Sequence, residues 1–156
     1  MDVMRIPDGV KMVRELEKSG LSYDDALLAT KQFVASGSTP PVARPIDITD
    51  KLVKVVPAGG APSTGTGYWM TQSEFNALKA DPASMVSKLG LPPYMHADAF
   101  DVFQITPRPG ALVFESTIAP TTVNGVASTT GGARQTIVVD RNQFTPPVKI
   151  GSVKVN

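Results

Sequence analysis

The abundance of glycine and proline most constrains the fold, because both residues interrupt regular secondary structure. The chain has 13 glycines and 14 prolines among its 156 residues, which exceeds the usual share of roughly 12%. Glycine permits turns with positive φ, and proline lacks the amide that a central strand needs. The sequence therefore predicts short strands, many turns, and loops that carry the function.

The first 37 residues have the pattern of two helices. Apolar residues recur every three positions from 10 to 16, and Gly20 follows where a helix would end. Ser22 can cap a second helix, which Gly37 ends. Such a helical hairpin is stable only when it packs on something else.

After these helices the pattern changes. Residues 38–50 contain three prolines and no periodicity, which is typical of a linker or an extended crossing segment. Residues 51–156 follow as a second unit, with short helices that begin after Thr71 and Asp81. Strands are predicted at 51–56, 100–105, 111–119, 134–140 and 148–155. The expected fold class is α+β, with a helical hairpin before a small domain of helices and a twisted antiparallel sheet.

Composition excludes several classes of function. The chain has no cysteine, so it cannot form a disulfide or a thiolate metal site. No apolar run approaches the roughly 20 residues of a membrane span, and a net charge of +1 predicts no broad surface for polyanions. Motifs for nucleotide-binding loops, nucleophile elbows and zinc peptidases are also absent from the sequence.

His96 is the single histidine, in the polar segment before a predicted strand. One interpretation makes it a general acid or base, because imidazole exchanges a proton near neutral pH. The other makes it an ordinary surface residue. Asp98 and Asp101 lie nearby, but their spacing matches no metal-binding pattern, and we expect no metal site.

A second candidate is the glycine pair at 131–132, which Arg134 and Gln135 follow. Paired glycines allow a backbone to approach a ligand, and a guanidinium offers several donors to a phosphate. A hairpin turn with an exposed arginine explains the same residues equally well. Arg108 and Arg141 lie in turns that could add positive charge to this edge.

Aromatic and hydroxyl side chains complete the candidates. Tyr68 and Trp69 follow a glycine-rich loop and could stack on a base or anchor the core. Thr117 lies on a predicted strand that also carries Glu115, and Thr121 follows this strand. Polar residues on such a strand either belong to a site or face solvent.

Several segments together resemble the C-terminal toxin region of bacterial contact-dependent growth inhibition proteins, the CdiA type carried on large filamentous-haemagglutinin-like surface proteins. They are SGLSYDDALLATKQFVASG, KLVKVVPAGG, GYWMT, VFESTIAPTT and GGARQTIVVDRNQF. The resemblance implies a module at 1–37 that helps the toxin enter the target cell, a linker at 38–50 and a toxic domain at 51–156. It also implies export as part of a large cell-surface protein, action in the cytoplasm of the target bacterium and no stable membrane insertion.

Toxic domains of this type are most often nucleases, and several resemble the RNase fold of barnase-like and colicin-like toxins. The resemblance therefore implies a metal-independent ribonuclease that cleaves tRNA without a cofactor. A cognate immunity protein would neutralise it, and a host factor of the target cell is a further possible partner. His96 would carry the proton, Thr117 or Thr121 would donate a hydrogen bond, and Arg134 with Lys54 would hold the phosphate.

A rival resemblance is to secreted NAD-glycohydrolase toxins related to the tuberculosis necrotizing toxin. Leu91-Pro-Pro, FDVFQI, Ala119-Pro120 and the segment from Gly131 to Gln135 occur in a similar order. This resemblance assigns His96 and Gln135 to the site, which would stabilise a ribosyl oxocarbenium ion. A third interpretation is a non-catalytic adhesin or interaction module.

Overall fold

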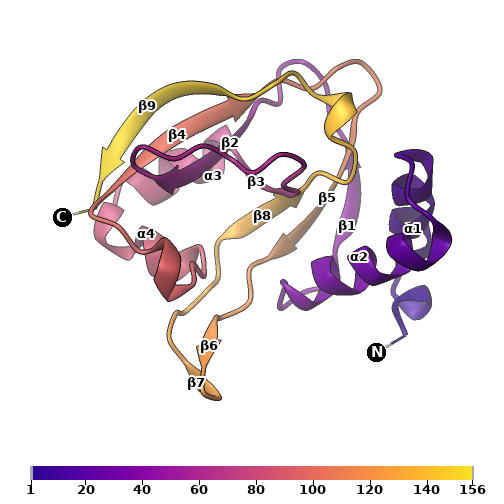
Figure 1. The fold of residues 1–156 in the computed structure, drawn as a ribbon, viewed down its shortest axis with the longest axis horizontal. Coiled ribbons are helices and arrows are strands. Elements are labelled where there is room, and N and C mark those ends of the chain that lie inside the picture. The colour runs from indigo at the N-terminus through magenta and orange to yellow at the C-terminus, as the bar shows by residue number, and fades with distance from the viewer. Residues whose placement is uncertain (1, 156) are drawn as a thin grey trace.

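The computed structural model describes residues 2–155 and has the predicted α+β class (Figure 1). Helices α1 (Gly9–Lys18) and α2 (Tyr23–Ala35) come first, and α3 (Gln72–Lys79) and α4 (Pro82–Lys88) lie between strands. Short 3-10 helices occur at η1 (Val3–Arg5), η2 (Pro93–Met95) and η3 (Arg141–Gln143).

Seven strands form one sheet in the order β1-β5-β8-β3-β2-β4-β9, and all neighbours are antiparallel. The strands are β1 (Val42–Pro45), β2 (Leu52–Pro57), β3 (Tyr68–Thr71), β4 (Ala99–Ile105), β5 (Leu112–Thr117), β8 (Arg134–Ile137) and β9 (Val148–Lys154). A separate hairpin of β6 (Thr122–Val123) and β7 (Val126–Ala127) projects away from the sheet (Figure 1).

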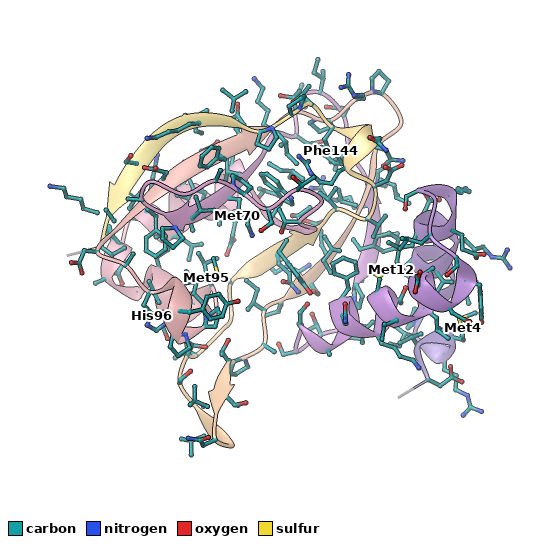
Figure 2. All side chains as sticks on the ribbon, viewed as in Figure 1. Met4, Met12, Met70, Met95, His96 and Phe144 are labelled. Atoms are coloured by element: carbon teal, nitrogen blue, oxygen red, sulfur yellow. The ribbon has the colours of Figure 1, made fainter. Side chains whose placement is uncertain are left out.

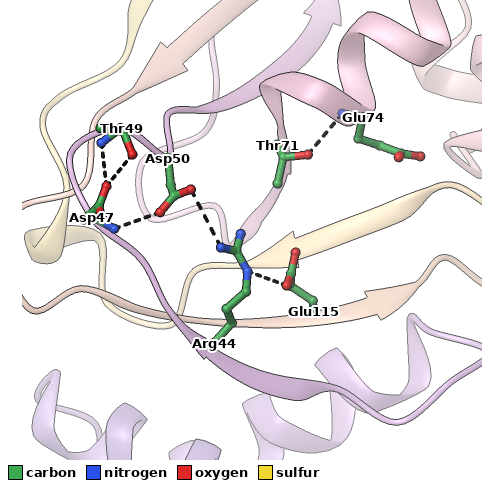
Figure 3. Close-up of polar contacts among 7 residues, drawn as sticks. All are labelled: Arg44, Asp47, Thr49, Asp50, Thr71, Glu74 and Glu115. Atoms are coloured by element: carbon green, nitrogen blue, oxygen red, sulfur yellow. Dashed lines mark hydrogen bonds and ion pairs between the residues drawn. The ribbon is translucent and has the colours of Figure 1, made fainter.

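The predicted capping residues begin two of the helices. The Ser22 hydroxyl accepts a hydrogen bond from the Asp25 amide at 3.1 Å, and α2 follows. The Thr71 hydroxyl accepts one from the Glu74 amide at 3.1 Å at the start of α3 (Figure 3). Each bond satisfies an amide that has no partner inside its helix.

The segment 38–50, expected to be a linker, contributes edge strand β1 to the sheet. Its residues pair with β5, and the Arg44 Nε lies 2.5 Å from an oxygen of Glu115. Arg44 also reaches Asp50, and Asp47 closes the following turn by accepting from Thr49 (Figure 3). An edge strand tolerates proline because one of its sides needs no partner, so proline content did not separate this strand from a linker.

The two N-terminal helices share a hydrophobic core with the sheet. Met12 and Leu16 of α1 pack in one buried cluster with Phe114 of β5 and Ile137 of β8. Figure 1 shows this helical pair beside β1. The division into a delivery module, a linker and a toxic domain stays a prediction about function, but residues 2–37 belong to the packed structure.

Two further clusters stabilise the rest of the sheet. One lies between α3, α4 and strands β2, β3 and β4, around Phe75, Met85 and Phe100. The other surrounds Trp69 and Phe144, where β2, β3 and β5 meet the segment before β9. None of the helices in residues 2–155 has both the length and the apolar character of a membrane span.

Candidate active site

A pocket of about 440 Å³ opens between the sheet and the segment that follows α4. Its walls come from the end of α2, from β2, β3 and β8, from residues 89–95, and from the loop 118–121. Met70 of β3 and Met95 of η2, both labelled in Figure 2, lie on two of these walls. Most of the lining is apolar, so its few polar groups decide what the pocket can bind.

Gln135 is the most deeply placed of these polar groups. Its side chain is only 4% exposed, and its amide nitrogen donates to the hydroxyls of Ser36 and Ser116, each at 2.9 Å. The Ser36 hydroxyl donates in turn to the Phe33 carbonyl at 2.6 Å. An amide nitrogen can only donate, so both hydroxyl oxygens accept from it, and this pair of bonds fixes the orientation of the Gln135 amide. The Gln135 carbonyl oxygen is therefore the end left for a ligand.

Lys54 is the cationic residue of the pocket wall. Its ammonium donates to the Tyr68 carbonyl at 3.0 Å, and no carboxylate in residues 2–155 forms an ion pair with it. Loss of hydration in this half-buried position lowers the pKa of Lys54 to about 8. A lysine without a carboxylate partner is available to an anionic group of a ligand.

Tyr68 contributes an aromatic ring and a phenol. The ring packs edge to face against Phe33, with centroids 5.3 Å apart. Burial raises the pKa of Tyr68, and a hydrogen bond with Ser36 opposes part of that effect. The phenol is therefore neutral at pH 7 and can donate or accept a hydrogen bond.

The glycine pair contacts the loop 118–121, which lines the pocket. A Cβ on Gly131 would lie 2.5 Å from the Ile118 carbonyl oxygen, so only glycine allows the two backbones to come this close. The Gly132 amide donates to that carbonyl at 3.0 Å. The Thr121 hydroxyl donates to the Gly90 carbonyl and joins this loop to the end of α4. The loop is thereby held next to Gln135.

Arg134 and Thr117 lie on the opposite face of the sheet from Gln135. Side chains alternate between faces along a strand, and Thr117 pairs with Arg134 as Ser116 pairs with Gln135. Arg134 donates to the Thr117 hydroxyl at 3.1 Å, and neither residue lines the pocket. The structure thus separates Arg134 from Lys54, its partner in the predicted phosphate clamp, and from Gln135.

His96 lies outside this pocket, in a smaller hollow of about 330 Å³ that Asp98 also lines. Figure 2 shows His96 next to Met95 beside α4. The His96 Nε2 lies 2.8 Å from the Leu91 carbonyl oxygen and so donates to it. This hydrogen bond holds the segment 91–96 together. A role of His96 in catalysis stays a prediction.

The other predicted binding residues are dispersed. The Trp69 ring is only 3% exposed, and its indole donates to the Thr66 carbonyl at 3.0 Å. The Arg141 guanidinium lies 4.9 Å from the centre of that ring, and burial lowers its pKa. Arg108 is exposed in the turn before β5. Of the ten predicted site residues, the pocket lining contains Lys54, Tyr68, Trp69, Thr121 and Gln135.

Asp101 is explained by structural contacts. Its carboxylate accepts from the Gly59 amide and the Ser152 hydroxyl, each at 2.9 Å, and lies 3.4 Å from Lys149. The Gly59 amide, more than the other contacts, lowers the pKa of Asp101. Within residues 2–155 no group of carboxylates and histidine is arranged to hold a metal ion.

Two pocket residues were missed by the sequence analysis. Ser36 orients Gln135. It lies at the end of α2 and belongs to no sequence motif. Tyr94 lines the pocket from η2. The only sequence signal for Tyr94 is the Leu91-Pro92-Pro93 break, which indicates the end of a helix and nothing about a site.

Comparisons with known proteins place the fold. No protein-family model matches this chain, and no curated protein sequence matches it. Among solved structures, the chain is similar to Tse6 in its complex with Tsi6, with a TM-score of 0.51 and 12% identity, over 94% of this chain and 98% of that one. It also matches Rhs1-CT in complex with its cognate immunity protein RhsI1, with a TM-score of 0.49 and 15% identity, over 74% of this chain and 85% of that one. At these identities the likeness concerns the fold alone, which agrees with the predicted α+β class.

Proposed function

We propose that this chain is the toxic domain of a bacterial toxin, that it hydrolyses NAD, and that a cognate immunity protein neutralises it. The sequence resemblance to toxin regions supports the first part. The fold shared with Tse6, whose structure was solved with Tsi6 bound, supports a protein partner. The chemistry of the pocket favours one of the two candidate reactions, RNA cleavage and NAD hydrolysis.

The observation that carries the proposal is that the pocket lining within residues 2–155 holds neither a histidine nor a carboxylate. The titratable residues of this lining are Lys54, Tyr68 and Tyr94. Cleavage of RNA requires a base for the 2′-hydroxyl and an acid for the leaving oxygen. NAD needs no acid for its leaving group, because nicotinamide is bonded as a pyridinium cation and departs neutral. The pocket therefore suits NAD better than RNA.

The reaction is a substitution by water at the ribose C1′ of NAD. The bond from C1′ to the nicotinamide nitrogen breaks, and its electron pair stays on nicotinamide. Water forms the new bond to C1′ and releases one proton to solvent, which leaves ADP-ribose. Positive charge develops on the ribosyl group on the way, so the transition state is stabilised by oxygen dipoles.

Three residues have distinct parts in this proposal. The free carbonyl oxygen of Gln135 faces the ribosyl cation and orients the attacking water. The Lys54 ammonium holds the diphosphate of NAD. Thr121 acts through the loop 118–121, because its hydroxyl already donates to Gly90.

The test is hydrolysis of NAD by protein made by cell-free synthesis, with release of nicotinamide measured by chromatography. We expect Gln135→Ala to lower kcat by about 100-fold or more, the usual effect of removing one preorganised dipole from a reacting centre. Gln104→Ala is the matched control, because Gln104 is a half-buried glutamine on β4 that does not line the pocket. We expect its rate to equal that of the wild type.

Two results would contradict the proposal. One is wild-type protein that leaves NAD intact but cleaves tRNA. The other is full activity of folded Gln135→Ala. Gln135→Met keeps the length of the side chain without its amide dipole, and it replaces the alanine variant if that variant does not fold, as judged by circular dichroism.

A further inference from the structure

Among the large hydrophobic residues of the described chain, 2–155, Tyr94 is the most exposed, yet it lines the pocket. Its side chain is 85% exposed. An aromatic ring in water loses the stabilisation that burial would give it. Single exposed aromatic residues are common on protein surfaces. Tyr94 differs from them because it lies at a pocket, where a bound ligand would cover its ring.

The backbone that carries Tyr94 is held in place before any ligand binds. Pro92 and Pro93 restrict φ on one side, and the Met95 amide donates to the Pro92 carbonyl at 2.9 Å. The His96 imidazole donates to the Leu91 carbonyl. An aromatic side chain on such a support loses little backbone entropy when it contacts a ligand.

Tyr94 and Gln135 both line the pocket but differ greatly in exposure. Gln135 is 4% exposed, whereas Tyr94 is 85% exposed. A ligand whose reacting bond is next to the buried Gln135 extends from there towards the exposed part of the lining, to which Tyr94 belongs. In a dinucleotide that is split at the nicotinamide, the part that extends away from the reacting bond ends in the adenine.

We propose that Tyr94 stacks on the adenine ring of the bound dinucleotide and so supplies part of the affinity for it. This proposal rests on the NAD hydrolysis proposed above. Stacking of one base on one aromatic side chain is sequence-tolerant and strong enough to change affinity by about tenfold or more. Tyr94 contacts the part of the ligand that does not react, so it acts on binding and not on bond cleavage.

The experiment measures kcat and KM for NAD, and the Kd of ADP-ribose by calorimetry, in the wild type, Tyr94→Ala and Tyr94→Phe. We expect Tyr94→Ala to raise both KM and Kd by about tenfold while kcat stays within about twofold. Tyr94→Phe keeps the ring and should restore both constants. Tyr23→Ala is the matched control, because Tyr23 is an exposed tyrosine on α2 that does not line the pocket.

The outcomes separate this inference from the proposed function. An unchanged KM in Tyr94→Ala overturns the inference alone, and so does a fall in kcat with KM unchanged. If the wild type does not hydrolyse NAD, the proposed function fails, and the Kd of ADP-ribose then decides the inference. The inference is supported if Tyr94→Ala weakens the binding of ADP-ribose and Tyr94→Phe restores it. It is overturned if ADP-ribose does not bind, or if its Kd is the same in the wild type and in Tyr94→Ala.

Discussion

At the scale of single residues, Lys54 links the pocket to pH. Its pKa is lowered to about 8 because the half-buried ammonium has lost part of its hydration. Below that pH the side chain is charged and can hold a diphosphate, and above it the charge is lost. The proposed role of Lys54 therefore predicts weaker substrate binding in alkaline solution.

We expect the KM of the wild type for NAD to rise about fivefold between about pH 7 and about pH 9, as the ammonium deprotonates. Lys54→Met, which keeps the volume but not the charge, should have the raised KM at both pH values. Lys51→Met serves as the control, since Lys51 is exposed on the same segment and outside the pocket. A wild-type KM that does not change over this range would remove Lys54 from substrate binding.

At the scale of elements, the glycine pair before β8 packs against the loop 118–121, which forms one wall of the pocket. Gly131 and Gly132 both have positive φ, at 62° and 98°. Only Gly131 faces another backbone, because a Cβ on Gly132 would meet nothing within 4 Å. An alanine at either position would therefore have a strained backbone, but only at position 131 would its Cβ also clash with neighbouring atoms.

We expect Gly131→Ala to cost about 3 kcal/mol in free energy of unfolding and Gly132→Ala about 1 kcal/mol, because the first adds a clash to the strain. Urea unfolding of the two variants measures the difference. Equal losses would mean that the close approach of Gly131 to residues 118–120 does not stabilise the wall.

The sequence predicted those elements that depend on local signals. Thr71 and Ser22 are caps whose hydrogen bonds involve neighbouring residues, so their helices could be recognised from the chain alone. Strand β1 depends on its pairing with β5, about 70 residues away, and its own residues do not alternate. The local sequence pattern therefore predicts a linker there and gives no sign of the pairing.

The site was predictable in part for the same reason. The glycine pair indicates Gln135 as a site residue. It indicates Arg134 as well, because the two residues are adjacent in sequence. Alternation along β8 places their side chains on opposite faces. Tyr94 could not be found, because its only distinction is its position at the mouth of a pocket that distant segments form.

At the scale of the whole molecule, the helical pair and the sheet share one core. Met12 of α1 is fully buried in the cluster that contains Phe114 and Ile137. A module that only delivers the toxin would unfold without effect on the sheet. The shared core predicts instead that helices and sheet unfold together.

We expect Met12→Ala to destabilise the whole domain by about 3 kcal/mol, because it leaves a cavity between the helices and the sheet. Trp69 is the only tryptophan and lies in a different cluster. Its fluorescence should therefore shift together with the helical circular dichroism signal in urea. Loss of the helical signal before any change of Trp69 fluorescence would establish 2–37 as a separate unit.

The most direct test of the central claim is to express the chain in bacteria without an immunity protein and to assay NAD and total RNA from the same culture. The proposed reaction predicts that NAD falls while tRNA stays intact, and that cells producing Gln135→Ala keep their NAD. Cleaved tRNA with normal NAD would contradict this account and would return attention to His96, Lys54 and Arg134.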